Sequence, residues 1–192
     1  MLRSLYNWTL EKSKHPKALW ILAAFSFAES SFFPIPPDVL LIPMVLAAPT
    51  RAWRIALICS VASVFGGIFG YYIGYALFET VGQPIIDFYA MQEKFVWFQA
   101  RYNEYGAWIV GAAGFTPIPY KVFTIASGLT QLDLTTFIVA SVLSRTARFF
   151  LVAALLKKYG TPIRNFIEKR LGLLTLLFFT LLIGSFLALK YI

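Results

Sequence analysis

Five ionisable residues interrupt apolar stretches of this sequence: Glu29, Asp38, Lys121, Arg145 and Arg148. An isolated charge at the centre of a bilayer costs at least ~2.5–3.5 kcal/mol, so these side chains should face one another or water and not lipid. Arg145 and Arg148 are three residues apart and would project from one face of a helix. The five residues comprise three bases and two acids, so their net charge is positive. This surplus charge predicts a site for an anionic ligand.

The rest of the chain indicates an integral membrane protein. It is 59% hydrophobic and only 14% charged, and several apolar runs approach the ~18 residues typical of a membrane span. The net charge of +8 comes from basic residues beside these runs, a pattern typical of orientation signals and contacts with anionic lipid, so no nucleic acid partner is expected.

Cofactor and enzyme chemistry have little support in the sequence. The chain contains one His and one Cys, which excludes a His- or Cys-rich metal site. It has no Gly-rich nucleotide loop, and no nucleophile–base pair can be placed. We therefore expect no metal, no cofactor and no enzymatic activity.

Proline-rich breaks recur 83 residues apart. Aligning residues 34–46 with 117–129 gives six identities in thirteen positions and places Asp38 opposite Lys121. Proline prevents a continuous helix, and a duplicated segment of this kind is typical of a transporter built from two halves. The breaks are predicted at Pro34, Pro36, Pro37, Pro117 and Pro119.

The apolar segments around the first break are too short to cross a membrane. Residues 18–33 and 37–48 would reach ~24 and ~18 Å as helices, against a hydrocarbon core of ~30 Å. We therefore expect a re-entrant hairpin there and a second one around the other break. A single crossing between them makes the repeat inverted, so Asp38 and Lys121 should meet near the midplane. An ion pair that merely holds the two hairpins together is the alternative.

The predicted fold is an all-α integral membrane protein, an inverted repeat of re-entrant hairpin plus transmembrane helix, with interfacial helices and a third C-terminal transmembrane helix. Within one membrane domain, residues 1–192, we predict an amphipathic interfacial helix at 1–17, hairpins at 18–48 and 106–131, an interfacial segment at 80–105, and spans at 54–78, 134–156 and 171–190. On this topology eleven Lys and Arg residues lie on one side and three on the other, which predicts a cytoplasmic N-terminus and an outer C-terminus in the inner membrane.

Gly66, Gly70 and Gly74 form a GxxxGxxxG face on the first span. Such a face permits close approach of two helix backbones. Internal helix packing is the favoured interpretation, and a homo-oligomer interface is the alternative.

At these residues the chain resembles the DedA family, the VTT or "SNARE-associated" superfamily, and most closely its YqaA-like branch. The resemblance rests on Glu29, on Phe33 to Asp38, on Phe115 to Lys121, on Ala126-Ser127-Gly128 and on the glycine-rich span. Typical members carry Arg-Phe-x-Pro-x-x-Arg in the second hairpin. Here Gly114 occupies the first Arg position and Lys121 stands one residue from the second; Arg145 and Arg148 would supply the missing charge.

The resemblance implies movement of membrane lipids, with undecaprenyl phosphate or a phospholipid as the partner and a link to the proton-motive force. We expect a flippase- or scramblase-like lipid transporter in which Lys121, Arg145 and Arg148 hold an anionic headgroup. Glu29 and Asp38 would couple or release it by taking up protons. The alternatives are a proton- or cation-coupled carrier of a small solute and a membrane scaffold protein.

Overall fold

A computed structural model describes the backbone of residues 17–33, 35–116 and 118–188, with side chains as far as Gly160 and again at Pro162. All regular secondary structure in this part of the chain is helical. The amphipathic helix predicted over residues 1–17 lies outside it, apart from its last residue. The predicted breaks at Pro34 and Pro117 also lie outside the described residues.

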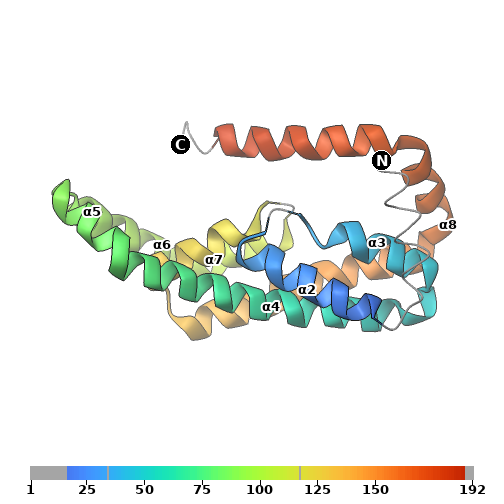
Figure 1. Cartoon of the computed structure of the whole chain (residues 1–192), viewed down its shortest axis with the longest axis horizontal. Coiled ribbons are helices and arrows are strands. Elements are labelled where there is room, and N and C mark those ends of the chain that lie inside the picture. Colours follow the sequence, from blue (N-terminus) through green and yellow to red (C-terminus); the bar gives the residue numbers. More distant parts are fainter. Residues whose placement is uncertain (1–16, 34, 117, 189–192) are drawn as a thin grey trace.

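Two long helices, α4 (Ala52–Leu77) and α8 (Leu134–Ala188), form the frame of the molecule. The described residues contain two helical stretches long and apolar enough to cross a membrane, Pro49–Phe88 and Leu134–Gly160. Figure 1 shows α8 turning back on itself in the region that contains Pro162, a residue that interrupts helical hydrogen bonding. The predicted third span at 171–190 falls beyond this bend, where α8 is helical to Ala188 and side chains are not described.

Two pairs of shorter helices pack against this frame. The first pair is α2 (Ala18–Ser31) and α3 (Asp38–Ala47), and the second is α6 (Gln92–Phe115) and α7 (Tyr120–Leu129). In Figure 1, α2 runs toward the middle of the molecule and α3 runs back, while α6 and α7 do the same from the opposite end. The two breaks therefore lie near each other at the middle of the molecule.

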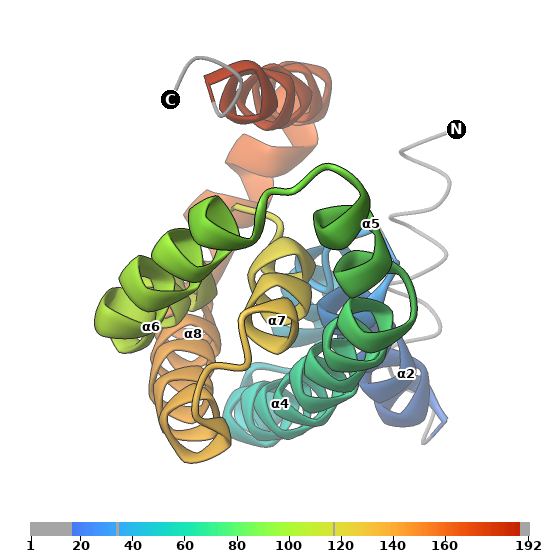
Figure 2. The same cartoon turned by 90° about the vertical axis from the view of Figure 1, so that its left-hand side faces the viewer.

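The two helix pairs pack on α4 and α8 in opposite order. Helix α2 packs on α4 and α3 on α8, whereas α6 packs on α8 and α7 on α4. Figure 2 shows α7 lying between α6 and α4, and α7 also touches α2. This exchange brings residues from both breaks against the middle of both long helices.

An interfacial segment is predicted at 80–105 and a hairpin from 106, and helix α6 runs across the boundary between the two. A π-helix, η2 (Phe78–Gly82), and a short helix, α5 (Gln83–Phe88), follow α4, and the chain then turns at Ala90, whose φ of 51° is left-handed. Helix α6 then runs unbroken from Gln92.

Polar side chains of α6 explain why this helix is continuous. Gln99 and Asn103 donate hydrogen bonds to the Thr130 carbonyl at the end of α7, and the Tyr102 hydroxyl contacts Ser127. These three polar groups are satisfied by α7, whereas Arg101 and Glu104 of the same helix pair with each other on its exposed side.

The core is divided into two apolar clusters with a polar layer between them. One cluster contains Leu22, Leu41, Ile55 and Phe149, and the other contains Tyr71, Val110, Tyr120 and Phe137. Both long helices pass from one cluster to the other. Where they do so, they carry buried polar side chains: Ser60 and Ser63 on α4, and Ser141, Ser144 and Arg145 on α8.

Glycine lets α4 approach its neighbours closely. A Cβ at Gly66 would overlap the Phe27 carbonyl of α2, and a Cβ at Gly74 would overlap the Ile125 carbonyl of α7. At Gly70 it would meet the Thr124 hydroxyl. The glycine face thus packs inside the molecule and holds one helix of each pair against the centre of α4.

Candidate functional site

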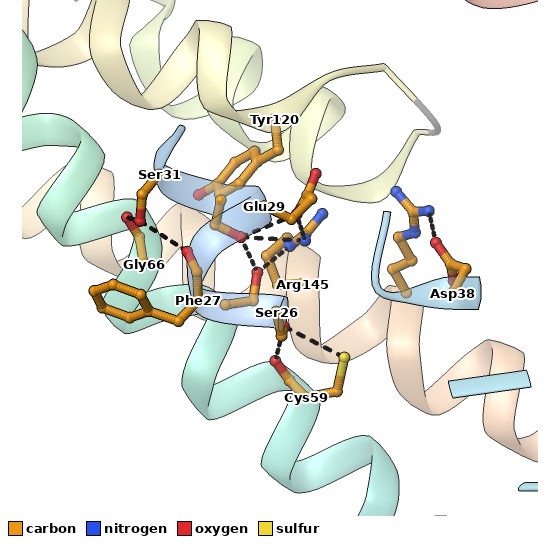
Figure 3. A network of polar contacts seen from close by, with 12 residues as sticks. Ser26, Phe27, Glu29, Ser31, Asp38, Cys59, Gly66, Tyr120 and Arg145 are labelled. Carbon is orange, nitrogen blue, oxygen red and sulfur yellow. Dashed lines mark hydrogen bonds and ion pairs between the residues drawn. The ribbon is translucent and has the colours of Figure 1, made fainter. Parts of the chain in front are cut away.

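The buried centre of the molecule holds an ion pair between Glu29 of α2 and Arg145 of α8, with 2.8 Å between Oε2 and Nη2. The side chains are only 12% and 1% exposed. Arg145 also donates from Nε to Ser63 and, at 3.4 Å, from Nη2 to Ser30. Ser30 in turn donates to Glu29 at 3.1 Å. Burying a charge is costly unless it is paired and hydrogen-bonded, and this network meets both conditions (Figure 3).

Aromatic rings cover the remaining faces of the Arg145 guanidinium. Its central carbon lies 4.7 Å from the ring centroid of Tyr120 and 4.7 Å from that of Phe149. Ring faces attract cations when water is excluded. The Tyr120 hydroxyl is satisfied by Ser141. Arg145 is thus held on all sides by groups from four different helices.

A second ion pair lies nearer the surface, between Asp38 at the start of α3 and Arg148 of α8. Asp38 Oδ2 and Arg148 Nη2 are 2.6 Å apart. Arg148 also donates at 2.7 Å to the Thr116 carbonyl, where α6 ends. The side chains of Asp38 and Arg148 are 20% and 15% exposed. One arginine therefore bridges the two breaks.

Both pairs lie well inside α4 and the apolar stretch of α8. Ser63 is eleven residues after Ala52 and fourteen before Leu77, and Arg145 is eleven after Leu134 and fifteen before Gly160. At ~1.5 Å per residue these separations are ~16–22 Å on either side. The charges are therefore far from the ends of both long helices.

Lys121 does not pair with Asp38, in contrast to the prediction from the repeat. In the described part of the chain the Lys121 ammonium makes no ion pair, and the residue is partly buried in the first turn of α7. Asp38 and Lys121 are equivalent in the repeat, but equivalence does not require contact. The two carboxylates are matched by the two arginines, and the surplus positive charge resides on Lys121.

The two helices that begin after the breaks, α3 and α7, each follow a proline. Pro37 precedes α3 and Pro119 precedes α7, so each helix begins directly after a proline. A helix N-terminus carries partial positive charge. At α3 the Asp38 carboxylate lies in this first turn. Pro36 lies in the same break, one residue before Pro37.

Several residues that contact the two arginines were not identified from the sequence. Ser63 is an ordinary polar residue of a span, although it lies one helical turn before Gly66 and so on the packed face. Phe149 is one of many aromatics, and the Thr116 carbonyl belongs to the backbone. Among the described residues no group of three or more His, Cys, Asp or Glu side chains could hold a metal ion.

Comparisons with known proteins place this chain in a family. A family model described as "VTT domain" matches residues 35–158. A protein of Haemophilus influenzae, named only as uncharacterized, is 40% identical over 169 residues, which cover 86% of this chain and 88% of the relative.

Two further relatives are also named only as uncharacterized. One, from Histophilus somni, is 40% identical with the same coverage, and another, from Methanocaldococcus jannaschii, is 28% identical over 66% of this chain and 76% of its own. No solved structure gives a significant match.

Proposed function

Because the chain belongs to the VTT-domain family of membrane proteins, we propose that it moves a lipid with an anionic phosphate headgroup across the bilayer. The headgroup passes through the charged centre, while the hydrocarbon chains stay in the membrane. The observation that carries the proposal is the Asp38–Arg148 pair: a mid-span arginine, partly exposed, that joins two helix breaks.

The lengths of three of the four hairpin arms support re-entrant hairpins; the fourth arm, α6, has 24 residues, or ~36 Å at ~1.5 Å per residue. Helix α2 has 14 residues and α3 and α7 have 10 each, or ~21 and ~15 Å at ~1.5 Å per residue. These are short of the ~30 Å hydrocarbon core. Together with the exchanged packing on α4 and α8, they support an inverted repeat whose two tips meet in the bilayer.

Charge balance supports an anionic headgroup. The two acids and two arginines of the centre neutralise one another, and Lys121 adds one positive charge close in sequence to Tyr120, which covers Arg145. A phosphate oxygen is a good partner for the planar guanidinium of Arg148. We therefore infer that the headgroup competes with Asp38 for Arg148, with Lys121 as a second contact.

The same competition provides a link to protons. Taking up a proton removes the negative charge of Asp38, and Arg148 is then free to bind phosphate. Loss of that proton restores the ion pair and expels the headgroup. Glu29 is more deeply enclosed and has more partners, so we assign the exchange to Asp38 and the structural pairing to Glu29.

The test is lipid movement in proteoliposomes that carry fluorescent phosphatidylglycerol or phosphatidylcholine. Replacing Arg148 or Lys121 by Ala is expected to slow the anionic lipid strongly, because each variant removes a phosphate contact. Arg101→Ala is the matched control, since it removes an exposed Arg–carboxylate pair, with Glu104, outside the centre. Rates for phosphatidylglycerol that are unchanged in both variants would refute the proposal.

Competition by a soluble anion separates this proposal from a small-solute carrier. Inorganic phosphate added to both compartments should have little effect on a lipid transporter. If labelled phosphate or another small ion is itself carried, and lipid is not, the protein is a solute carrier that uses the same charges.

A further inference from the structure

A groove of about 640 Å³ lies between α6 and the first half of α8. Its walls are almost entirely apolar. It is lined by Trp108, Gly111 and Phe115 on α6, and by Val139, Leu143 and Ser144 on α8, among other residues. We infer that this groove holds one acyl chain of an anionic phospholipid while its headgroup is at Arg148, an inference that rests on the proposed function.

The groove has the length of one leaflet. Along α8 it extends from Thr135, in the first turn, to Ser144, which is ~14 Å at ~1.5 Å per residue. The hydrocarbon core of a bilayer is ~30 Å thick. The groove therefore covers about half of that thickness, from one end of the apolar stretch of α8 to its middle.

The inner end of the groove is lined by residues that are next in sequence to members of the charged centre. Phe115 lines the groove and the next residue, Thr116, accepts a hydrogen bond from Arg148. Ser144 lines it from the other side and precedes Arg145. A chain lying in the groove would thus start beside the guanidinium that we assign to the phosphate.

Polarity along the groove fits a hydrocarbon chain. Hydroxyl groups occur only at its ends, from Thr135 and Thr136 at the outer end and Ser144 at the inner end. The stretch between them presents only carbon-rich side chains and Gly111. Trp108 and Leu143 are exposed on its rim, so the groove opens sideways toward lipid and a chain could enter without crossing the protein.

Charge complementarity favours a phospholipid over a second copy of the chain as the occupant. The inner end lies beside a centre whose surplus charge is positive, through Lys121, and which contains a partly exposed arginine. An acyl chain attached to an anionic headgroup would match both the apolar groove and the positive centre. A second copy would bring only an apolar helix face to the groove.

Gly111 offers a clean way to block the groove. A Cβ at this position would meet nothing within 4 Å, so Gly111→Leu should add a side chain to the empty space without displacing its neighbours. Replacing glycine inside a helix also favours the helix. Val139→Trp blocks the groove from α8, and Val61→Trp is its matched control on a comparably exposed position of α4.

The experiment uses the full chain in vesicles containing phosphatidylglycerol with a photoactivatable diazirine in one acyl chain. Crosslinks mapped by mass spectrometry should concentrate on residues 107–115 and 135–144. They should be lost from these segments in Gly111→Leu and Val139→Trp but retained in Val61→Trp. Transport of phosphatidylglycerol should fall in the first two variants and not in the control.

Three results would overturn the inference. Crosslinks spread evenly over the exposed face of α4 would mean that the groove contacts only bulk lipid. Unchanged crosslinking and transport in Gly111→Leu would mean that no chain occupies it. Disulfide-linked dimers of Gly111→Cys, formed between copies at low density in the membrane, would assign the groove to a second chain.

The outcome is separable from that of the proposed function. If Arg148→Ala stops transport while Gly111→Leu does not, the headgroup site stands and the groove assignment fails. If neither the charged centre nor the groove affects transport, but acyl crosslinks still concentrate at the groove, the groove binds lipid and the transport proposal fails.

Discussion

The two ion pairs on α8 differ in what surrounds them, although their arginines are one helical turn apart. Arg145 is 1% exposed and contacts Glu29, two serines and two rings. Arg148 is 15% exposed and holds one carboxylate and one carbonyl, each at a helix break. The inner pair is enclosed and well hydrogen-bonded, whereas the outer pair is partly exposed.

We propose that this difference reflects a division of roles. A charge that is fully enclosed by its own protein cannot exchange partners without unfolding its surroundings. A charge at a break, with water or a headgroup within reach, can. We therefore expect substitutions at the inner pair to act mainly on folding and those at the outer pair mainly on transport.

The largest effect is expected for Arg145→Met. Removing one partner of a buried ion pair leaves the Glu29 carboxylate uncompensated, which costs about 3–5 kcal/mol. Thermal unfolding of purified protein in detergent, followed by tryptophan fluorescence, measures it. The double variant Glu29→Gln with Arg145→Met should recover much of the loss, because neither charge then remains. A double variant as unstable as the single one would contradict this assignment of the cost to unpaired charge.

Ser63→Ala should destabilise the protein less than Arg145→Met. It removes the acceptor of Arg145 Nε and the 2.7 Å contact with Ser30, and a buried donor without a partner costs about 1–3 kcal/mol. Ser60→Ala is the control on the same helix, since the Ser60 hydroxyl donates a hydrogen bond to the Ala56 carbonyl of its own helix. Equal melting temperatures for the two variants would show that Ser63 does not support the inner pair.

Arg148→Ala should destabilise the protein less than Arg145→Met. About 1.5–3 kcal/mol is typical for a hydrogen bond to a charged group, and the partial exposure of Asp38 lets solvent replace part of it. The comparison with transport is decisive: a small shift in melting temperature should accompany a large loss of phosphatidylglycerol movement. If stability and transport fall in the same proportion as in Arg145→Met, the proposed division of roles is wrong.

Asp133 provides an exposed carboxylate as a reference for the buried ones. It accepts a hydrogen bond from the Thr136 backbone N–H at the start of α8, which lowers its pKa from 3.8. A lowered folded-state pKa means that this stabilisation is present above pH 3.8 and is lost as the pH falls through the lower folded-state value. Asp133→Asn should show a smaller loss of stability than the parent over that acid range, measured as melting temperature against pH.

Particular residues mark how far the sequence could predict this structure. The apolar runs and the prolines predicted helices that break near residues 34–37 and 117–119, and the structure places α3 and α7 directly after these breaks. The exclusion of isolated charge from lipid predicted that the buried acids and bases would gather. Four of the five do so, in two pairs.

Which acid meets which base was not predictable from the chain. The repeat placed Asp38 opposite Lys121, because alignment identifies equivalent positions. Contact depends instead on where α8 crosses the first helix pair, and that crossing brings Arg148 to Asp38 and Arg145 to Glu29. The continuous α6 was missed for a related reason, since Gln99, Tyr102 and Asn103 of this helix bond to α7.

Hydrophobic side chains, proline and glycine act locally: the first favour transfer out of water, proline lacks an N–H group, and glycine lacks a side chain. The amino-acid order alone therefore determined an α-helical membrane protein with two broken helices and a close-packed glycine face. Distances between side chains of α2, α3 and α8 depend on crossing positions set by the packing of all helices at once. Only the tertiary structure therefore decided that one arginine is enclosed and the other accessible, because burial is a property of neighbours far away in the chain.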